Sequence, residues 1–273
     1  MIKLFVIGTG KMGGAISGGL VARNVFKAQE IAAFDVNPAA AENFARQIGC
    51  AAYSSADAAK AAMAEAPAVL LAVKPQVFES ALAAWTQNGV DLAGKLVISI
   101  VAGVPIARLA RSVGGERIVR VMPNTPALVG CGAAAYAPGA AATEEDVKLV
   151  EKILSAVGMS RRMKENDLDA VTALSGSGPA YVFEFIQALA DGGVAEGLSR
   201  EAAQALAVQT VLGSALMVAK SGTHPAVLKD AVTSPGGTTI RALEVLADRG
   251  FAGAVIQAVR AAAARSRELG AGK

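Results

Sequence analysis

The stretch IKLFVIGTGKMGGAISGGLVAR, Ile2 to Arg23, decides the fold. Its apolar run IKLFVIG predicts a strand, and KMGGAISGGLVAR predicts a helix directly after it. Between them Gly8-Thr9-Gly10-Lys11-Met12-Gly13 fits G-x-G-x-x-G, a pattern typical of dinucleotide binding when it joins a strand to a helix. Its glycines permit a tight turn, close approach of the backbone to a pyrophosphate, and packing of the helix on the strand. Free amides at the helix N-terminus would hold the phosphates. A glycine turn without a ligand is the alternative.

Strands and helices alternate through the first half of the chain. Further strands are expected at 31–35, 68–73, 96–100, 117–122 and 133–136, with helices at 38–49 and 143–157 among those between them. Such alternation predicts βαβ units and a parallel sheet covered on both faces. The interpretation is an α/β Rossmann-type N-terminal domain.

The pattern changes at the charged stretch 162–167. No clear strand follows, and helices are expected at 179–197, 200–220, 238–248 and 252–269. We therefore expect two domains, a dinucleotide-binding domain over 1–162 and an all-α C-terminal domain over 163–273.

Composition excludes several classes of protein. Hydrophobic residues make up 53% of the chain and charged residues 18%, which is not typical of a disordered chain. The net charge is +3 with no run of Lys or Arg, so a nucleic-acid partner is not expected. Cys50 and Cys131 are expected to be reduced, buried thiols. With one histidine, His224, and no C-x-x-C, no metal site is expected.

A membrane span is not expected either. The apolar segment 178–198 is interrupted by Glu184, Asp191 and Glu196, which favours a buried helix. The N-terminal apolar run is short and ends in a glycine turn, unlike a cleavable signal. These features predict a soluble cytoplasmic protein.

Asp35 ends the second expected strand. A carboxylate there can accept a hydrogen bond from a ribose 2′-hydroxyl and would repel a 2′-phosphate, which favours NADH. No arginine adjoins Asp35, and Asn37 is the nearest polar alternative. A helix N-terminal charge before Pro38 is the other interpretation of this aspartate.

Three more segments follow strands, where open α/β sheets bind ligands. Val73, Lys74 and Pro75 follow the third strand, Ala102 follows the next, and Asn124 follows the strand at 117–122. Lys74 could contact the ribose or phosphates of the cofactor, and Asn124 could present its amide to the nicotinamide. An ordinary loop lysine and a structural turn are the alternatives.

A second glycine segment, Ser234-Pro235-Gly236-Gly237-Thr238-Thr239, opens a helix in the second half. It has no capping box, because Arg241 and Ala242 follow the two threonines at the third position. The free amides and the hydroxyls of Ser234, Thr238 and Thr239 predict a small pocket for a carboxylate. A helix-to-helix turn with a threonine cap is the alternative.

These segments together resemble pyrroline-5-carboxylate reductase, over nearly the whole chain. The resemblance rests on GTGKMGGAI, AVKPQ, SIVAGV, RVMPNTPALVG, ALSGSGPAY and above all DAVTSPGGTTIRALEVL. It implies a Rossmann domain followed by a helical domain that dimerises or forms larger homo-oligomers. It also implies reduction of Δ1-pyrroline-5-carboxylate, a cyclic imino acid, to L-proline with NADP(H), with NAD(H) possible.

The resemblance also implies roles for site residues. Residues 8–13 would hold the pyrophosphate, and Lys74, Ala102 and Asn124 would frame the nicotinamide end. Gly236 and Gly237, with the hydroxyls beside them, would bind the substrate carboxylate, and Thr239 would contact the ring nitrogen as the catalytic residue. A protonated cyclic iminium already carries the activating charge, so no strong general acid is required.

Two other functions are weighed against this one. A reductase of the β-hydroxyacid dehydrogenase type would carry a catalytic lysine on the first long helix of the second domain, but no lysine occurs between Lys164 and Lys220. A non-catalytic dinucleotide-binding regulator would leave the second glycine segment unexplained. Activity on six-membered cyclic imines and a catalytic role of His224 stay open.

Overall fold

The computed structural model describes residues 1–87 and 92–270, and it divides the chain into two compact units. Unit 1 comprises 1–177 together with the chain from Ala262 onward, and unit 2 comprises Gly178–Ala261. The expected domain boundary after residue 162 coincides with the end of the last strand. Unit 1 continues beyond it because Leu168 is buried against Ala135 and Ala137 of the sheet.

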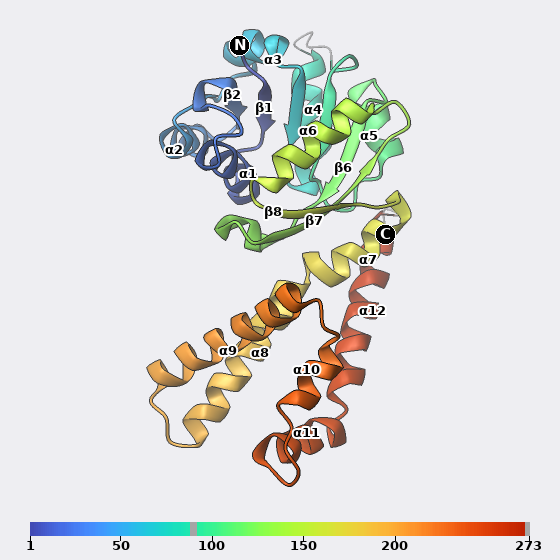
Figure 1. The fold of residues 1–273 in the computed structure, drawn as a ribbon. Helices are drawn as coiled ribbons and strands as arrows, with labels where there is room; N and C mark the ends of the chain where they lie inside the picture. Colours follow the sequence, from blue (N-terminus) through green and yellow to red (C-terminus); the bar gives the residue numbers. More distant parts are fainter. Residues whose placement is uncertain (88–91, 271–273) are drawn as a thin grey trace. The chain divides into compact units, whose positions relative to one another are not determined.

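Unit 1 is built on an eight-stranded sheet in the order β3-β2-β1-β4-β5-β6-β7-β8 (Figure 1). The strands are β1 (Leu4–Ile7), β2 (Ile31–Phe34), β3 (Ala51–Tyr53), β4 (Ala68–Leu71), β5 (Leu96–Ser99), β6 (Ile118–Met122), β7 (Gly132–Pro138) and β8 (Gly158–Arg162). Every pair is parallel except β6 with β7. The predicted Rossmann-type fold is confirmed. Sequence reasoning missed β3, which has three residues, and β8, whose sequence GMSRR is not apolar.

Helices cover both faces of the sheet (Figure 1). One face carries α1 (Lys11–Ala22), α2 (Pro38–Ile48) and α6 (Glu144–Ser155), and the other carries α3 (Ala56–Glu65), α4 (Phe78–Gln87) and α5 (Ile106–Val113). The shorter segments are η1 (Ala28–Glu30), η2 (Pro75–Val77), η3 (Thr125–Val129), η4 (Glu165–Asp167), α7 (Leu168–Val171) and η5 (Thr172–Gly176).

Alternating side chains of the central strand create a core on each face. In β1, Leu4 and Val6 join one buried cluster, and Phe5 and Ile7 join the other. On the second face the ring of Trp85 meets Phe5 edge-to-face at 5.4 Å between ring centroids. This two-sided burial explains why the strand is continuously apolar.

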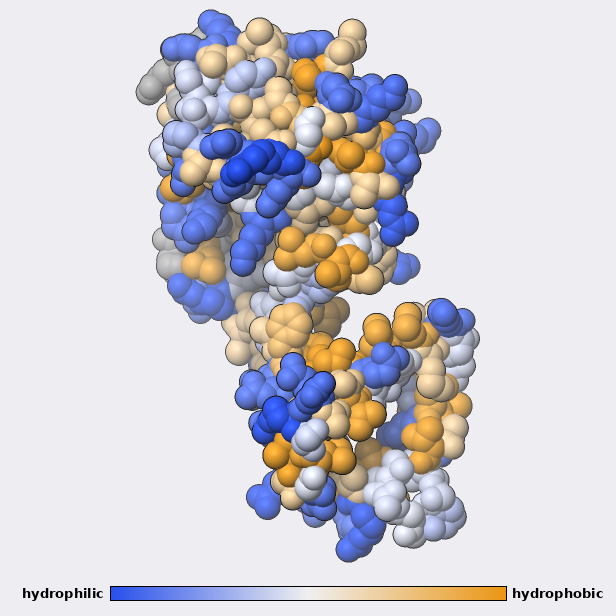
Figure 2. Space-filling view, turned by 90° about the vertical axis from the view of Figure 1, so that its left-hand side faces the viewer, coloured by the Kyte–Doolittle hydropathy of each residue, from blue (hydrophilic) through white to orange (hydrophobic). Residues whose placement is uncertain are grey.

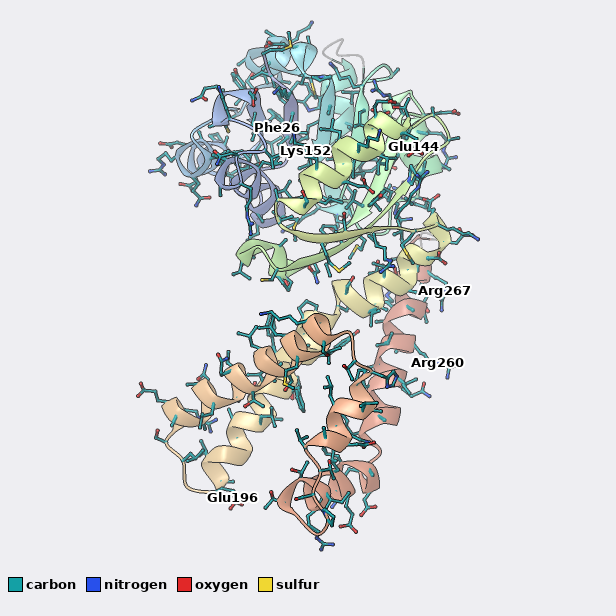
Figure 3. The ribbon with its side chains drawn as sticks, viewed as in Figure 1. Phe26, Glu144, Lys152, Glu196, Arg260 and Arg267 are labelled. Carbon is teal, nitrogen blue, oxygen red and sulfur yellow. The ribbon has the colours of Figure 1, made fainter. Side chains whose placement is uncertain are left out.

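Helix α6 is fixed by its ends. Thr143 and Asp146 form a capping box at its N-terminus. Figure 3 shows Glu144 and Lys152 toward opposite ends of this helix, with charges that complement the helix dipole. The side chain of Asp146 is 3% exposed and binds Arg117 through both carboxylate oxygens, at 2.7 and 2.9 Å.

The two cysteines differ in burial. Cys50 is buried, and burial raises the pKa of its thiol to about 11. Cys131 is exposed, so the expectation of two buried thiols is wrong for this residue. It lies beside the first residue of β7, where the chain leaves η3 on the surface.

Unit 2 is entirely helical in the part that the structure describes. Its helices are α8 (Gly178–Ala195), α9 (Arg200–Ser221), α10 (Pro225–Ala231), α11 (Thr238–Asp248) and the first half of α12 (Phe251–Gly270). The four predicted helices are present within two residues at each end, and α10, with seven residues, was not predicted. Its buried cluster consists of three alanines, Ala190, Ala203 and Ala207, between α8 and α9.

Large apolar side chains lie on the surface of unit 2. Orange side chains gather over its helices in Figure 2. The exposed large apolar side chains of unit 2 include Phe183 on α8, 64% exposed, and Leu212 on α9, 50% exposed. Helix α11 has no buried residue, so its apolar residues such as Ile240, 40% exposed, and Leu246, 39% exposed, stay exposed in the single chain. By length and composition alone α9 could cross a membrane, whereas the apolar segment 178–198 begins with α8.

Candidate functional site

The glycine turn joins β1 to α1 as the sequence predicts. Gly8 has φ +99°, and a Cβ there would lie 2.7 Å from the carbonyl oxygen of Ala72. A Cβ on Gly13 would lie 2.5 Å from the carbonyl oxygen of Gly8, whereas one on Gly10 would meet nothing within 4 Å. The first and third glycines are therefore required by the turn and its packing, and the second leaves the backbone open to a ligand.

The N-terminus of α1 is suited to an anion. Gly10 is the N-cap residue, no side chain caps the helix, and its first turn contains no acidic residue. Its amides therefore keep their hydrogen-bonding capacity, and the dipole places a partial positive charge beside them. This end of α1 can hold the phosphates of a dinucleotide.

Asp35, directly after β2, is tied to this turn. One carboxylate oxygen accepts hydrogen bonds from the amide and the hydroxyl of Thr9, both at 2.9 Å, and the other accepts from the amide of Asn37 at 3.0 Å. Asn37 uses its own side chain to cap α2, accepting from the amides of Ala39 and Ala40. The predicted ribose acceptor is therefore also a structural link between β2 and the glycine turn.

Two cavities line the edge where the parallel strands end. One of about 420 Å³ lies between the ends of β1, β2 and β4 and is lined by Gly8, Asp35, Val73 and Lys74 among others. It occupies the point where the strand order reverses, where ligands of doubly wound sheets bind. The other, of about 490 Å³, has Pro75 and Ala102 in its wall.

The second cavity is also lined by helix α12. Ser266 on α12 donates a hydrogen bond to Asp169 at 2.6 Å and lies in this wall. Leu269 approaches Gly103, whose Cβ position lies 3.8 Å from the Leu269 Cβ atom. Sequence reasoning missed this return of the C-terminal helix to unit 1, because no local pattern announces it.

Asn124 has partners other than the predicted one. Its amide nitrogen donates to the carbonyl of Ser175 at 3.0 Å, and its oxygen accepts from the amide of Ala133 at 2.8 Å. The side chain is buried. Asn124 thus ties the loop after β6 to η5, a turn of π-helix of the kind that often marks functional positions.

Glu165 is a residue that sequence reasoning missed. Its Oε1 atom accepts from the amide of Ile106, the first residue of α5, at 2.6 Å and from Arg120 on β6 at 3.2 Å. It therefore caps, from 59 residues away, the helix that follows the Ala102 loop. A charged stretch after a strand gave no signal for this contact.

The second glycine segment opens α11 in unit 2. Gly237 is the N-cap residue with no side-chain cap, and the first turn contains no acidic residue, as the missing capping box predicts. Gly236 has φ +66°, and a Cβ on Gly237 would lie 2.2 Å from the Ser234 hydroxyl. Thr238 is exposed and Thr239 half-buried. The segment brings amides and three hydroxyls together at one helix end.

His224 has a local structural contact. Its Nδ1 atom accepts a hydrogen bond from the amide of Ala226 at 3.2 Å and caps α10, whose first residue is Pro225. This contact supports a structural role for His224 at the start of α10 rather than a catalytic one.

These features define a class: a dinucleotide-binding oxidoreductase fold with an appended helical region. Family models agree, one described as NADP oxidoreductase, coenzyme F420-dependent, over residues 3–103, and one as pyrroline-5-carboxylate reductase dimerisation over 165–269. Pyrroline-5-carboxylate reductase of Arabidopsis thaliana is 44% identical over 98% of this chain and 95% of its own length. The chain belongs to the pyrroline-5-carboxylate reductase family.

Other comparisons agree with this assignment. The pyrroline-5-carboxylate reductase of Escherichia coli K12 is 41% identical over 98% of both chains. The crystal structure of a Plasmodium falciparum pyrroline carboxylate reductase with NADP bound has a TM-score of 0.86, at 36% identity over 98% of both chains. The resemblance inferred from the sequence is confirmed.

Proposed function

We propose that this protein reduces Δ1-pyrroline-5-carboxylate to L-proline with NADP(H), NAD(H) being a possible alternative. The observation that carries the proposal is the pair of uncapped helix N-termini, α1 after the glycine turn and α11 after the second glycine segment. One suits a pyrophosphate and the other a carboxylate. Family membership supports the same reaction.

The cofactor supplies the hydride, and the protein orients the reactants. In this proposal the backbone amides of residues 8–13, Met12 among them, hold the pyrophosphate, and the Lys11 side chain takes no part in that contact. The cavity of about 420 Å³ would hold the adenosine and is called the adenosine cavity; Asp35 and Val73 border it, and Lys74 contacts the ribose or phosphates. Pro75 and Ala102 frame the nicotinamide end.

Asn124 has a mainly positioning role at the nicotinamide end. Because its amide already binds Ser175 and Ala133, it holds the segment before α8 in place and keeps only one N–H for a ligand.

The substrate carboxylate binds the amides of Gly236 and Gly237 and the hydroxyls of Ser234 and Thr238. Thr239 hydrogen-bonds the ring nitrogen and orients it without titrating. The iminium carbon then accepts the hydride, since the charge on its nitrogen makes that carbon electrophilic. This assignment explains why a helix N-terminus without acidic residues follows the loop.

We also propose a cytoplasmic homodimer, or a larger homo-oligomer, assembled through unit 2. Support comes from the exposed apolar side chains of α8 and α9 and from the match to a dimerisation family over 165–269. Burial of such side chains is the main driving force of obligate association.

The test is oxidation of NADPH and NADH by the purified protein, with and without pyrroline-5-carboxylate. Substrate-dependent oxidation is expected, and cofactor binding without oxidation would contradict the proposed substrate. Thr239→Ala should lower kcat by roughly 100-fold, the scale of one oriented polar contact in a transition state. Dissociation constants for NADPH should stay unchanged, and equal loss of binding and turnover would refute the role of Thr239.

A further inference from the structure

The end of β2 offers no positive charge to a 2′-phosphate. Residues 31–45 contain no lysine or arginine, and Asp35 stands where a ribose 2′-hydroxyl is usually bound. The first cationic residue after β2 is Arg46, which donates to Asn43 on its own helix. Yet a relative is known with NADP bound. The charge that would balance a 2′-phosphate must therefore come from another element.

A third cavity, of about 740 Å³, begins beside Thr9 and runs along α1. Its walls come from α1, α2 and η3, and Ala40 and Asn43 lie on the α2 side. Among the residues that the structure describes, the charged ones in its lining are Lys11 at one end and Arg23 at the other, and none is acidic. The cavity is thus positive, and it meets the adenosine cavity at Gly10, which lines both.

The two cations of this cavity have no acidic partner in the described part of the chain. Neither Lys11 nor Arg23 forms an ion pair within residues 1–87 and 92–270. Lys11 is exposed, and the space above Gly14, one turn further along α1, is open to 4 Å. The side chain of Lys11 is therefore available to a ligand at the N-terminal end of α1.

We propose that Lys11 is the residue that recognises the 2′-phosphate of NADP(H), on the α1 side of Thr9. Thr9 connects the positions of Asp35 and Lys11. It lines this cavity, and its amide and hydroxyl also donate hydrogen bonds to the Asp35 carboxylate. A 2′-hydroxyl can use Asp35, whereas a 2′-phosphate is attracted to Lys11 and to the positive end of α1. The chain consequently accepts both cofactors, and Lys11 sets their ratio. The inference rests on the proposed function only in its choice of cofactor.

Arg23 provides a matched control. It lines the same cavity with the same charge, but twelve residues along α1 place it roughly 18 Å from Lys11 at 1.5 Å per residue.

Calorimetric titration of the full-length protein with 2′,5′-ADP and with 5′-AMP separates the contribution of the 2′-phosphate from that of the rest of the nucleotide. Lys11→Gln should weaken 2′,5′-ADP binding about tenfold, the equivalent of ~1.4 kcal/mol. Binding of 5′-AMP should not change, Lys11→Arg should restore most of the loss, and Arg23→Gln should have no effect.

Several outcomes would overturn the proposal. Equal weakening of both ligands by Lys11→Gln would assign Lys11 to the 5′-phosphate instead. Unchanged 2′,5′-ADP binding in Lys11→Gln, together with a selective loss of 2′,5′-ADP binding in Lys74→Gln, would assign the 2′-phosphate to the adenosine cavity. Because these titrations need no pyrroline-5-carboxylate, a failed turnover assay with selective 2′,5′-ADP binding would refute the substrate and leave the role of Lys11 intact.

Discussion

Unit 1 and unit 2 belong to one chain but bury their side chains in different ways. Unit 1 has a large apolar cluster on each face of its sheet, with Trp85 and Phe5 fully buried. Unit 2 buries three alanines and leaves Phe183 and other large apolar side chains exposed. A single chain therefore completes the core of the cofactor-binding unit, whereas the described residues of the helical unit bury only this small cluster and leave large apolar side chains exposed.

The largest expected effect is on stability, from a substitution that leaves a cavity in the core of unit 1. Trp85→Ala should lower the free energy of unfolding by about 4 kcal/mol, because a fully buried aromatic side chain leaves a cavity. Urea denaturation followed by circular dichroism measures it. Trp85→Phe is the control and should lose much less, since its ring keeps part of the packing and the indole N–H has no hydrogen-bond partner in the described structure. Equal losses in the two variants would show that this core is not closely packed.

A charge introduced into the exposed apolar surface of unit 2 should weaken assembly of the homo-oligomer. Leu212→Asp should raise the dissociation constant of the homo-oligomer by roughly 100-fold, because an interface must then bury an unpaired charge. Light scattering during size-exclusion chromatography measures the stoichiometry. Met159→Asp, at a residue 55% exposed on β8 of unit 1, is the control and should leave it unchanged. An oligomer unaffected by Leu212→Asp would argue against assembly through α9.

Lowering the pH should change the contribution of ion pairs to stability differently in the two units. The Arg117 guanidinium, with smaller help from Thr143, lowers the pKa of Asp146. The folded-state pKa therefore lies below the unfolded one, so the ion pair stabilises the fold above about pH 4 and is lost as the pH falls through the folded value. Asp146→Asn should reduce stability at pH 7 by about 2 kcal/mol and by less at pH 3.

The control for this prediction lies in unit 2. Asp191 pairs with Arg200 at 2.5 Å, but both side chains are more than half exposed, and such pairs contribute little. Asp191→Asn should change stability by less than about 0.5 kcal/mol at either pH. Urea midpoints at pH 7 and pH 3 decide between the two sites, and a larger effect of Asp191→Asn would reverse the comparison.

Much of the site could be predicted because it consists of local patterns. Within six residues, Gly8 is required by its φ of +99° and Gly13 by the nearby carbonyl of Gly8, and the absence of a cap at Gly237 follows from the residues at the next turn. The partners of Asn124 could not be predicted, since Ser175 is 51 residues away and the contact depends on how η5 is wound. The capping of α5 by Glu165 is equally distant in sequence.

The sequence by itself determined the alternation of strands and helices, both glycine segments and the family, because each depends on residues that are neighbours along the chain. Only the tertiary structure decided that β7 runs antiparallel to β6, that the end of α12 returns to unit 1, and that the apolar face of α11 stays exposed. The physical reason is that an apolar pattern specifies which face of an element avoids water. It does not specify which partner covers that face, and the partner can be a distant segment of the chain or another molecule.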